Sequence, residues 1–183
     1  FLQFEEINKF LKYEKFNLQN LKTLNLLANE LTKIPTEINN LFNLEELILN
    51  NNKIIFLENL QNLKKLKNFQ IKSNKIKKIE NLKENKNLQK ISFSSNLISE
   101  INFDEFSCEE NLEELFLFGN YLGNEKNEKL NEEIFDNFLF GLKKFKKLTT
   151  LFIGGNYFNF FLVEDFLYAK IKIAKVKNGS TIS

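Results

Sequence analysis

Apolar and polar residues recur along this chain in a fixed order, with a period of 22 to 24 residues that is lengthened once. The clearest copy runs from Leu88 to Ile101 and reads LQKISFSSNLISEI. The other copies begin at Leu21, Leu44, Leu66, Leu112 and Leu148. A sustained period of this length indicates a solenoid in which each repeat forms one coil.

An asparagine stands at the same place in every copy, three residues after the second of two alternating apolar positions. The six are Asn29, Asn52, Asn74, Asn96, Asn120 and Asn156, and their separations are 23, 22, 22, 24 and 36 residues. A buried amide in a tight turn satisfies backbone groups of its own coil and of the neighbouring coil, which leucine could not do. We therefore predict that these asparagines form a structural ladder.

Short strands are predicted by the alternation that precedes each asparagine. In the Leu88 copy the strand covers about Lys90–Phe93, with Ile91 and Phe93 facing inward. Stacked coils would pair these strands into one parallel sheet. The segment from Glu128 to Phe140, with apolar residues at every fourth position, predicts a helix on the outer side that ends near Gly141.

This recurring LxxLxLxxN pattern resembles the leucine-rich repeat family over about residues 20–160. The 22-residue copies are similar to the repeats of intracellular phosphatase-regulatory members, and the IPTEI return at 34–38 is similar to that of Ras-pathway scaffolds. The resemblance implies an α/β solenoid with a curved parallel sheet on its concave side and helices and turns on its convex side. It also implies a non-catalytic module or scaffold that binds a protein partner.

The chain is predicted to be a single domain over residues 1–183. Residues 1–20 form an N-terminal helix or cap, because helical spacing runs from Phe4 to about Phe16 and a solenoid end otherwise exposes its core. Residues 21–158 hold the six repeats, and residues 159–183 hold a last strand and a tail. In that last strand Ile171 and Ile173 take the inward positions, and Val176 takes the place of the asparagine.

Composition limits the location and the partners. A net charge of +2 gives no strong bias toward nucleic acid or membrane, and no apolar run approaches a membrane span. The single cysteine, Cys108, cannot form an intrachain disulfide, which favours a reducing, intracellular compartment. We expect a cytoplasmic protein, with the nucleus as the alternative.

The sequence contains few residues that could support catalysis. The chain has no histidine, which removes both the Ser-His-Asp triad and the usual zinc ligands. Neighbouring acids such as Glu45 and Glu46 are expected to be solvated surface charge, and Cys108 has no base within sequence reach. We predict no enzymatic activity, no metal, no cofactor and no small-molecule substrate.

The concave face is the candidate binding surface, because residues between the inward-facing ones point to it. Its centre is polar, and its C-terminal end is aromatic. The predicted partner-binding residues are Phe116, Phe118, Tyr121, Phe152 and Tyr157, flanked by Lys170 and Lys172 of the last strand. Clustered aromatics are typical interface residues, and the lysines would favour an acidic partner. The alternative is that residues 158–166 or the tail cover these rings.

Two other functions stay open. Lysine runs at 64–67, 75–78 and 143–147 fit a structural subunit of a large complex, such as a ribonucleoprotein or cytoskeletal particle, in which lysines contact an RNA backbone. A solvated face is the simpler account of these runs. The third possibility is the targeting domain of a longer enzyme, since the sequence contains no methionine and so lacks its initiator residue.

Overall fold

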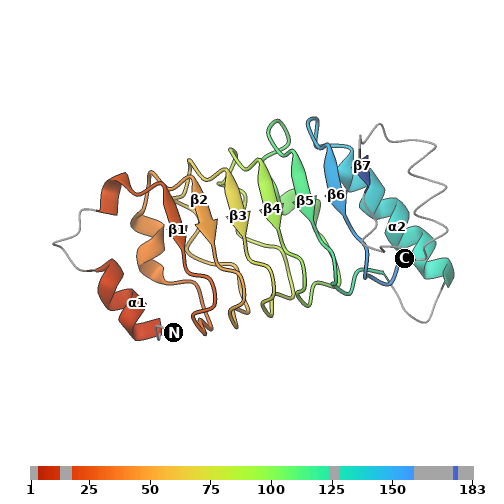
Figure 1. Ribbon diagram of the computed structural model, residues 1–183. Helices are drawn as coiled ribbons and strands as arrows, with labels where there is room; N and C mark the ends of the chain where they lie inside the picture. The colour runs from red at the N-terminus through yellow and green to blue at the C-terminus, as the bar shows by residue number, and fades with distance from the viewer. Residues whose placement is uncertain (1–3, 13–17, 124–127, 159–174, 177–183) are drawn as a thin grey trace.

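Short parallel strands form one sheet in which the strand order is the chain order. The computed structural model describes residues 4–12, 18–123, 128–158 and 175–176, and within them the sheet has seven strands, side by side along the molecule (Figure 1). The strands are β1 (Thr23–Asn25), β2 (Glu46–Ile48), β3 (Asn68–Gln70), β4 (Lys90–Ser92), β5 (Glu114–Phe116), β6 (Thr150–Phe152) and β7 (Lys175–Val176). The predicted solenoid is confirmed.

Equivalent residues of consecutive coils lie opposite one another across the sheet. Leu47 pairs with Leu24 on one side and with Phe69 on the other, and Ile91 pairs with Phe69 and Leu115. In β2 to β6 the middle residue is buried and its two neighbours are partly exposed. This confirms the predicted inward direction of Ile91, which is 0% exposed.

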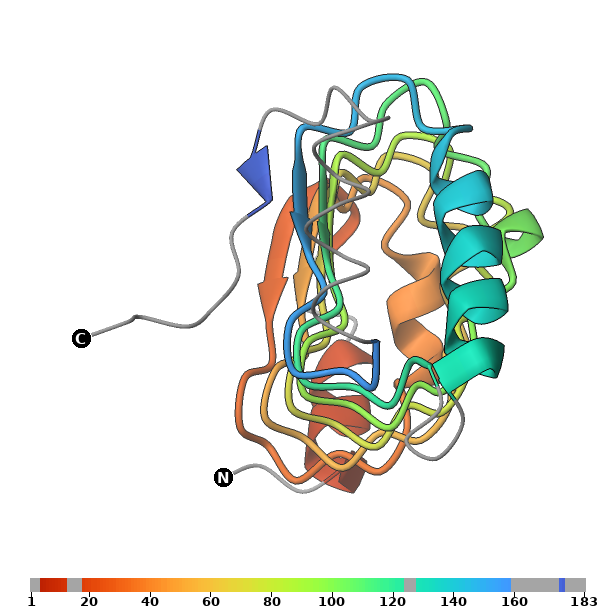
Figure 2. The same cartoon turned by 90° about the vertical axis from the view of Figure 1, so that its right-hand side faces the viewer.

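The return segments make the convex side of the solenoid. They contain the 3-10 turns η2 (Thr36–Asn40) and η3 (Phe103–Glu105) and the helix α2 (Glu128–Leu142). Figure 2, which looks along the stack, shows the sheet on one side and these elements on the other, with the coils nearly superimposed. The apolar side chains of both sides meet in one continuous core.

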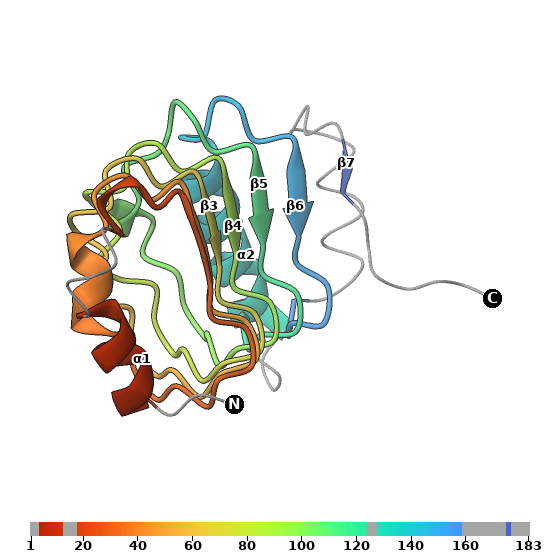
Figure 3. The ribbon, with the colours of Figure 1, turned by 60° about the vertical axis from the view of Figure 1, so that its left-hand side comes forward.

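The helix α2 ends at Leu142, one residue after Gly141, so the predicted helix end near Gly141 is confirmed, and the glycine also has a packing role. A Cβ atom at this position would lie 2.0 Å from Cδ2 of Phe103, whose ring therefore rests on the helix backbone. Lys144 reinforces the contact, because its Nζ donates to the Phe103 carbonyl at 2.5 Å and pairs with Glu109 at 3.1 Å. The glycine is thus a packing position where the Phe103 ring of η3 rests on α2, the helix that Figure 3 shows behind the strands of the sheet.

The N-terminal helix α1 (Phe4–Leu11) lies at the β1 end of the stack, followed by the 3-10 turn η1 (Leu18–Asn20) (Figure 1). Ile7 of α1 is 1% exposed and joins the core, so the helix covers part of the solenoid end as predicted. The helix ends at Leu11, earlier than the predicted Phe16, and residues 13–17 lie outside the described part of the chain.

An ion pair between Lys12, directly after α1, and Glu37 of η2 fastens this helix to the first coil, with Nζ and Oε1 3.0 Å apart. Glu37 is 8% exposed. Its burial raises the pKa of the carboxyl, but the hydrogen bonds from Lys12, from its own backbone N–H and from Thr36, with the Lys12 charge, outweigh burial and leave the pKa below its ordinary value of 4.5.

Replacing Lys12 by glutamine is expected to lower the free energy of unfolding at pH 7 by about 1 kcal/mol, because a largely buried carboxylate loses its counter-charge. A carboxyl with a lowered folded pKa stabilises the protein above its unfolded pKa, and that contribution is lost as the pH falls through the folded pKa. The difference between the variant and wild type should therefore be smaller at pH 3 than at pH 7. Urea titrations at both pH values measure it, and Lys9→Gln in the same helix is the control. An equal loss at both pH values would contradict the role of the charge.

The last strand departs from the predicted register. Lys175 pairs with Thr150 and Val176 with Leu151, so Val176 stands opposite a strand residue and not at the position of the ladder asparagine, Asn156. The predicted inward residues Ile171 and Ile173 lie outside the described residues. Without an asparagine to mark the turn, the alternation of apolar residues alone did not fix the register of this strand.

Candidate functional site

The amide of Asn96 joins its own coil to the preceding one. Its Oδ1 accepts the N–H of Ile76 at 3.0 Å, and its Nδ2 donates to the carbonyls of Ile71 and Phe93 at 3.0 and 2.9 Å. Ile71 and Ile76 belong to the preceding coil and Phe93 to the same coil as Asn96, while Phe93 also accepts from Asn120 of the following coil. Asn52, Asn74 and Asn120 are buried in the same way. The ladder fixes the height of each strand relative to the next.

The two end asparagines of the ladder are only half-buried. Asn156 still accepts from the N–H of Leu122 at 3.0 Å and donates to the carbonyl of Leu117 at 2.9 Å. Asn29 donates to the carbonyl of Leu27 within its own turn, at 3.1 Å. The structure thus places the six asparagines in one column, with the four inner members shielded from water.

The residue before each ladder asparagine adopts a left-handed backbone conformation. These residues are Ala28, Asn51, Ser73 and Ser95, with φ between 56° and 58°, and Gly119 and Gly155, with φ of 66°. The two glycines also allow the last coils to approach closely, since a Cβ on Gly155 would lie 3.2 Å from the backbone nitrogen of Gly119. This repeated turn sets the direction of the side chains that follow each asparagine.

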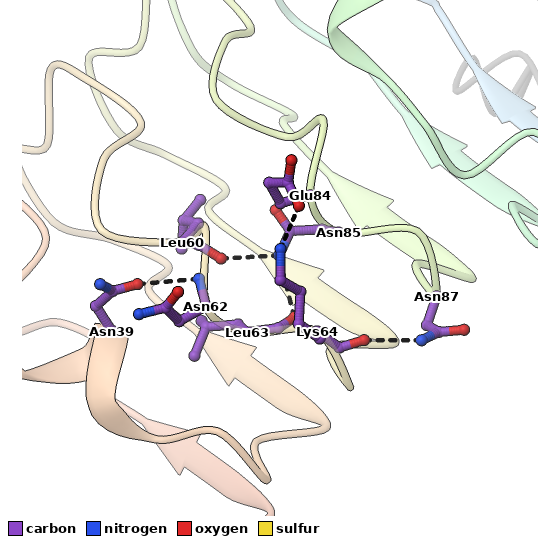
Figure 4. A network of polar contacts seen from close by, with 8 residues as sticks. All are labelled: Asn39, Leu60, Asn62, Leu63, Lys64, Glu84, Asn85 and Asn87. Atoms are coloured by element: carbon purple, nitrogen blue, oxygen red, sulfur yellow. Dashed lines mark hydrogen bonds and ion pairs between the residues drawn. The ribbon is translucent and has the colours of Figure 1, made fainter.

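Asparagines also join the coils on the outer side, which the sequence analysis missed. Nδ2 of Asn85 donates to the carbonyls of Leu60 and Leu63 at 2.9 and 3.1 Å, and Nδ2 of Asn87 donates to the carbonyl of Lys64 at 2.7 Å (Figure 4). In the sequence, the signal for these contacts is the recurrence of asparagines one repeat period apart. Such contacts are also made by Asn43, Asn59, Asn81 and Asn111.

Asn85 is unusual among them, because it is 0% exposed and its Oδ1 has no hydrogen-bond partner among the residues that the structure describes. It occupies the position that Leu41 and Leu63 take in the preceding coils. The carbonyls that it contacts already accept backbone N–H groups, Leu60 from Leu63 and Leu63 from Leu66. Asn85 therefore carries a buried unpaired oxygen without being needed to satisfy either carbonyl.

Replacing Asn85 by leucine is expected to raise the free energy of unfolding by about 1–2 kcal/mol, because it removes the unpaired oxygen and buries apolar surface. Thermal and urea unfolding followed by circular dichroism measure the gain. Asn85→Asp is the matched comparison: it keeps the shape but places a second acceptor beside two carbonyls, and should destabilise strongly. A leucine variant less stable than wild type would contradict this reading of the site.

The middle of the concave face is polar, and its side chains bond to one another. Nδ2 of Asn50 donates to Oε1 of Gln70 at 3.2 Å, Nε2 of Gln70 donates to Oδ1 of Asn68 at 3.3 Å, and Nδ2 of Asn68 donates to Oε1 of Glu46. These groups come from β2, β3 and the turn after β2. Because they satisfy one another, this region offers few unpaired groups to a ligand.

The aromatic patch, defined as Phe116, Phe118, Tyr121, Phe152 and Tyr157, occupies the C-terminal end of the same face. Phe116 of β5 and Phe152 of β6 lie opposite in the sheet register, and their rings stack with centroids 4.9 Å apart and planes 18° apart. Nζ of Lys90 lies 5.3 Å from the centroid of the Phe116 ring and pairs with Glu114 at 2.9 Å. The sequence prediction that the two phenylalanines are lateral neighbours matches this geometry.

The remaining members of the patch follow the strands. Phe118 is 39% exposed and Tyr121 is 44% exposed, and the rings of Tyr121 and Tyr157 have centroids 5.7 Å apart. Leu97, at the position equivalent to Tyr121 one coil earlier, is 37% exposed and extends the apolar surface. Gly154 takes the place of Phe118 in the next coil, so no side chain rises beside that ring. These side chains together form a continuous apolar surface.

The predicted flanking residues Lys170 and Lys172 lie outside the described residues, as does nearly all of the segment 158–166 proposed as a cover. Phe158 is described, and its ring packs edge-on against Phe135 of α2 with centroids 5.0 Å apart. The Phe158 ring is therefore directed toward the convex helix.

Lysines of the outer runs are paired with glutamates of adjacent coils. The Glu45 carboxylate forms ion pairs with Lys22 at 3.3 Å and with Lys67 at 2.7 Å. Hydrogen bonds from Lys67, and to a smaller extent from Lys22, lower the pKa of this carboxyl. Other pairs between coils are Lys64–Glu84, Lys78–Glu100, Lys83–Glu105, Lys144–Glu109 and Lys146–Glu110. Much of the positive charge in the lysine runs is therefore neutralised locally.

The groups that could support catalysis are scattered. Burial, with a smaller effect of Glu109, raises the pKa of the Cys108 thiol to about 12, so it stays protonated at neutral pH. Two hollows on the outer side, of about 320 and 560 Å³, are lined mainly by charged and amide side chains and share Glu105. In the described part of the chain no three His, Cys, Asp or Glu side chains gather as metal ligands.

Within residues 4–12, 18–123, 128–158 and 175–176, no helix combines the length and the apolar character needed to cross a bilayer.

Comparison with known proteins identifies the repeat. Residues 64–122 match the family model described as leucine rich repeat, a segment that contains β3, β4 and β5. A search of curated proteins gives no match. An LRR protein of Leptospira interrogans has a similar solved structure, with a TM-score of 0.63 and 25% sequence identity over 82% of this chain and 35% of that one.

Two internalins of Listeria monocytogenes share the fold. The internalin inlF has a TM-score of 0.55 and 24% identity over 82% of this chain and 45% of its own. Internalin C2 has a TM-score of 0.55 and 21% identity over 76% of this chain and 56% of its own. The present chain therefore spans between a third and somewhat more than half of the length of these similar proteins.

Proposed function

Because the chain is a leucine-rich repeat solenoid, we propose that it binds a protein partner through the aromatic patch at the C-terminal end of its concave face. The observation that carries the proposal is the group of partly exposed rings on adjacent coils, with Phe118 and Tyr121 the most exposed and with Phe116 stacked on Phe152 at 4.9 Å. Leucine-rich repeat proteins generally act in protein–protein interaction. That this chain uses the aromatic patch for it is our proposal.

The patch suits association for two physical reasons. Aromatic side chains bury a large apolar area with few rotatable bonds, and they are enriched among residues that dominate binding energy. The strands beneath them are locked by the asparagine ladder, so docking would order little of the backbone and would lose little entropy. Tyr121 and Tyr157 add hydroxyl groups to the edge of an otherwise apolar surface.

Attachment to a large RNA-containing assembly has less support. The ion pairs between coils engage many of the lysines that would contact phosphates, for example Lys64 with Glu84 and Lys67 with Glu45. Breaking these pairs would offset part of the gain from phosphate contacts. We propose no catalytic activity for this chain. The single cysteine, Cys108, is a free thiol, which favours a reducing compartment inside the cell.

The test compares two triple variants in capture from a native lysate of the source cells. Phe116→Ser, Phe118→Ser and Phe152→Ser together remove the patch, and Phe42→Ser, Phe56→Ser and Phe140→Ser together are the control. The control phenylalanines are 47%, 63% and 74% exposed and lie away from the concave strands. We expect wild type and control to retain the same proteins and the patch variant to lose them.

Circular dichroism and urea unfolding establish that both variants are folded before capture. Retention of the same proteins at equal yield by the folded patch variant would overturn the proposal. Loss of these proteins from the control but not from the patch variant would place the interface on the convex side.

A further inference from the structure

Two exposed lysines lie beside the aromatic patch without a counter-charge. Lys72 follows β3, and Lys75 follows the ladder asparagine of the same coil. Neither makes an ion pair with any residue in the described part of the chain, whereas the neighbouring Lys53 and Lys90 pair with Glu30 and Glu114. This part of the concave edge therefore carries two uncompensated positive charges.

The hydrogen bonds between coils place these lysines in line with the patch. Ser73 donates its N–H to the carbonyl of Ser94 at 2.9 Å, and Ser95 donates to the carbonyl of Phe118 at 2.7 Å. These bonds put Lys72, Ser94 and Phe118 at the same height on three successive coils. Lys72 and Phe118 are thus separated by two strand spacings, about 10 Å.

A second row runs parallel to the first along the turn edge. Leu97 donates its N–H to the carbonyl of Ile76, and Tyr121 donates to the carbonyl of Ile98, both at 2.8 Å. Lys75, Leu97 and Tyr121 therefore occupy equivalent positions on the same three coils. In the first row, Ser94 between Lys72 and Phe118 is small and 7% exposed, and in the second row, Leu97 between Lys75 and Tyr121 is 37% exposed and continues the apolar surface toward the lysines.

We infer that the partner docks an extended segment across the strands, with an acidic side chain against Lys72 and Lys75 and an aromatic or aliphatic side chain on Phe118 and Tyr121. An extended chain advances about 3.3 Å per residue, so a separation of about 10 Å corresponds to roughly three residues. Charge complementarity selects the acidic group, and the unpaired lysines lose no existing ion pair on binding. This inference rests on the proposed function and names the partner's chemistry.

The probe is a displayed library of random 12-residue peptides selected on the wild-type protein. Enriched peptides are expected to carry Asp or Glu about three residues from an aromatic or aliphatic residue. A fluorescein-labelled copy of the most enriched peptide is then titrated against variants by fluorescence anisotropy. Lys72→Glu with Lys75→Glu should weaken its binding by about tenfold or more, and 0.5 M NaCl should weaken binding to wild type.

The matched control is Lys86→Glu with Lys147→Glu, which makes the same change in net charge at exposed lysines outside the two rows. Its affinity should stay within about twofold of wild type. Enriched peptides without acidic residues, or equal binding by the Lys72 and Lys75 variant, would overturn the inference. If the enriched peptides lack acidic residues, or bind the Lys72 and Lys75 variant equally well, but lose binding when Phe116, Phe118 and Phe152 are replaced by serine, the inference fails and the proposed function stands.

Three further outcomes bear on the two proposals. Peptides insensitive to both the lysine and the phenylalanine variants would count against the proposed function itself. Self-association of the wild type that is lost on replacing Phe118 by serine, measured by sedimentation, would identify a second copy as the occupant and overturn the acidic segment. Failure of any peptide to enrich, while lysate capture succeeds, would exclude an extended segment in favour of a folded surface.

Discussion

Replacing Asn96 by alanine is expected to lower the free energy of unfolding by about 3–4 kcal/mol, among the largest effects of any single substitution in this chain. The variant leaves the buried N–H of Ile76 without its acceptor and removes the donor to three carbonyls, those of Ile71, Phe93 and Ser94. Two of these carbonyls keep another ladder amide, Ile71 from Asn74 and Phe93 from Asn120. The unpaired N–H and the vacated space therefore account for most of the loss.

Urea unfolding followed by far-UV circular dichroism measures this effect. Asn29→Ala is the internal control, because that side chain is half-buried at the end of the ladder, and it should cost less than about 1 kcal/mol. Equal losses at both positions would mean that the ladder contributes through turn propensity alone, and that its buried hydrogen bonds add nothing.

Replacing Phe93 by alanine is expected to cost about 3–5 kcal/mol, because its ring is fully buried at the centre of the stack. The ring meets that of Phe69 edge-on, with centroids 6.1 Å apart and planes 88° apart, so the variant loses an aromatic contact as well as volume. In the other coils this position holds leucine or isoleucine, for example Ile71 and Leu117.

Phe93→Leu is accordingly the matched comparison, and it should cost less than about 1.5 kcal/mol. Because each coil contacts only its neighbours, the alanine variant is also expected to lose cooperativity, with a broader urea transition than wild type. A sharp transition at an unchanged midpoint would show that the surrounding coils collapse into the vacated space.

The repeat period of the sequence was sufficient to predict the parts of the fold that recur from coil to coil. Strand positions, the inward direction of Ile91 and Phe93, and the neighbourhood of Phe116 and Phe152 all follow from equal spacing, since stacked coils place equivalent residues side by side. The same reasoning placed the polar middle and the aromatic end of the concave face.

Features that break the period, or that do not depend on side-chain type, could not be predicted. Ala28, Asn51, Ser73 and Ser95 adopt positive φ because the stacked coils impose the turn, and only the glycines of the last two coils marked it in the sequence. Asn85 stands in an apolar column, and no local pattern distinguishes a buried amide from an exposed one.

The packing role of Gly141 could not be predicted for a related reason. The glycine correctly marked the end of the helix, but the Phe103 ring that occupies the space beside it comes from nearly forty residues earlier in the chain. The contact between α2, which belongs to the long fifth coil, and η3 is not part of the repeating pattern. The unpaired state of Lys72 and Lys75 could also not be read from the sequence, because pairing depends on which glutamate each adjacent coil presents.

The dependence of each coil on its immediate neighbours has an evolutionary consequence. Asn52, Asn74 and Asn96 make the same contacts to the coil before them, with acceptors and donors in matching places. Deleting the 22 residues from 66 to 87 would bring Leu88 to the place of Leu66 and Asn96 to that of Asn74. The gene can therefore shorten or lengthen by whole modules, whereas loss of one residue between a strand and its ladder asparagine would turn the interior side chains of that coil out of register.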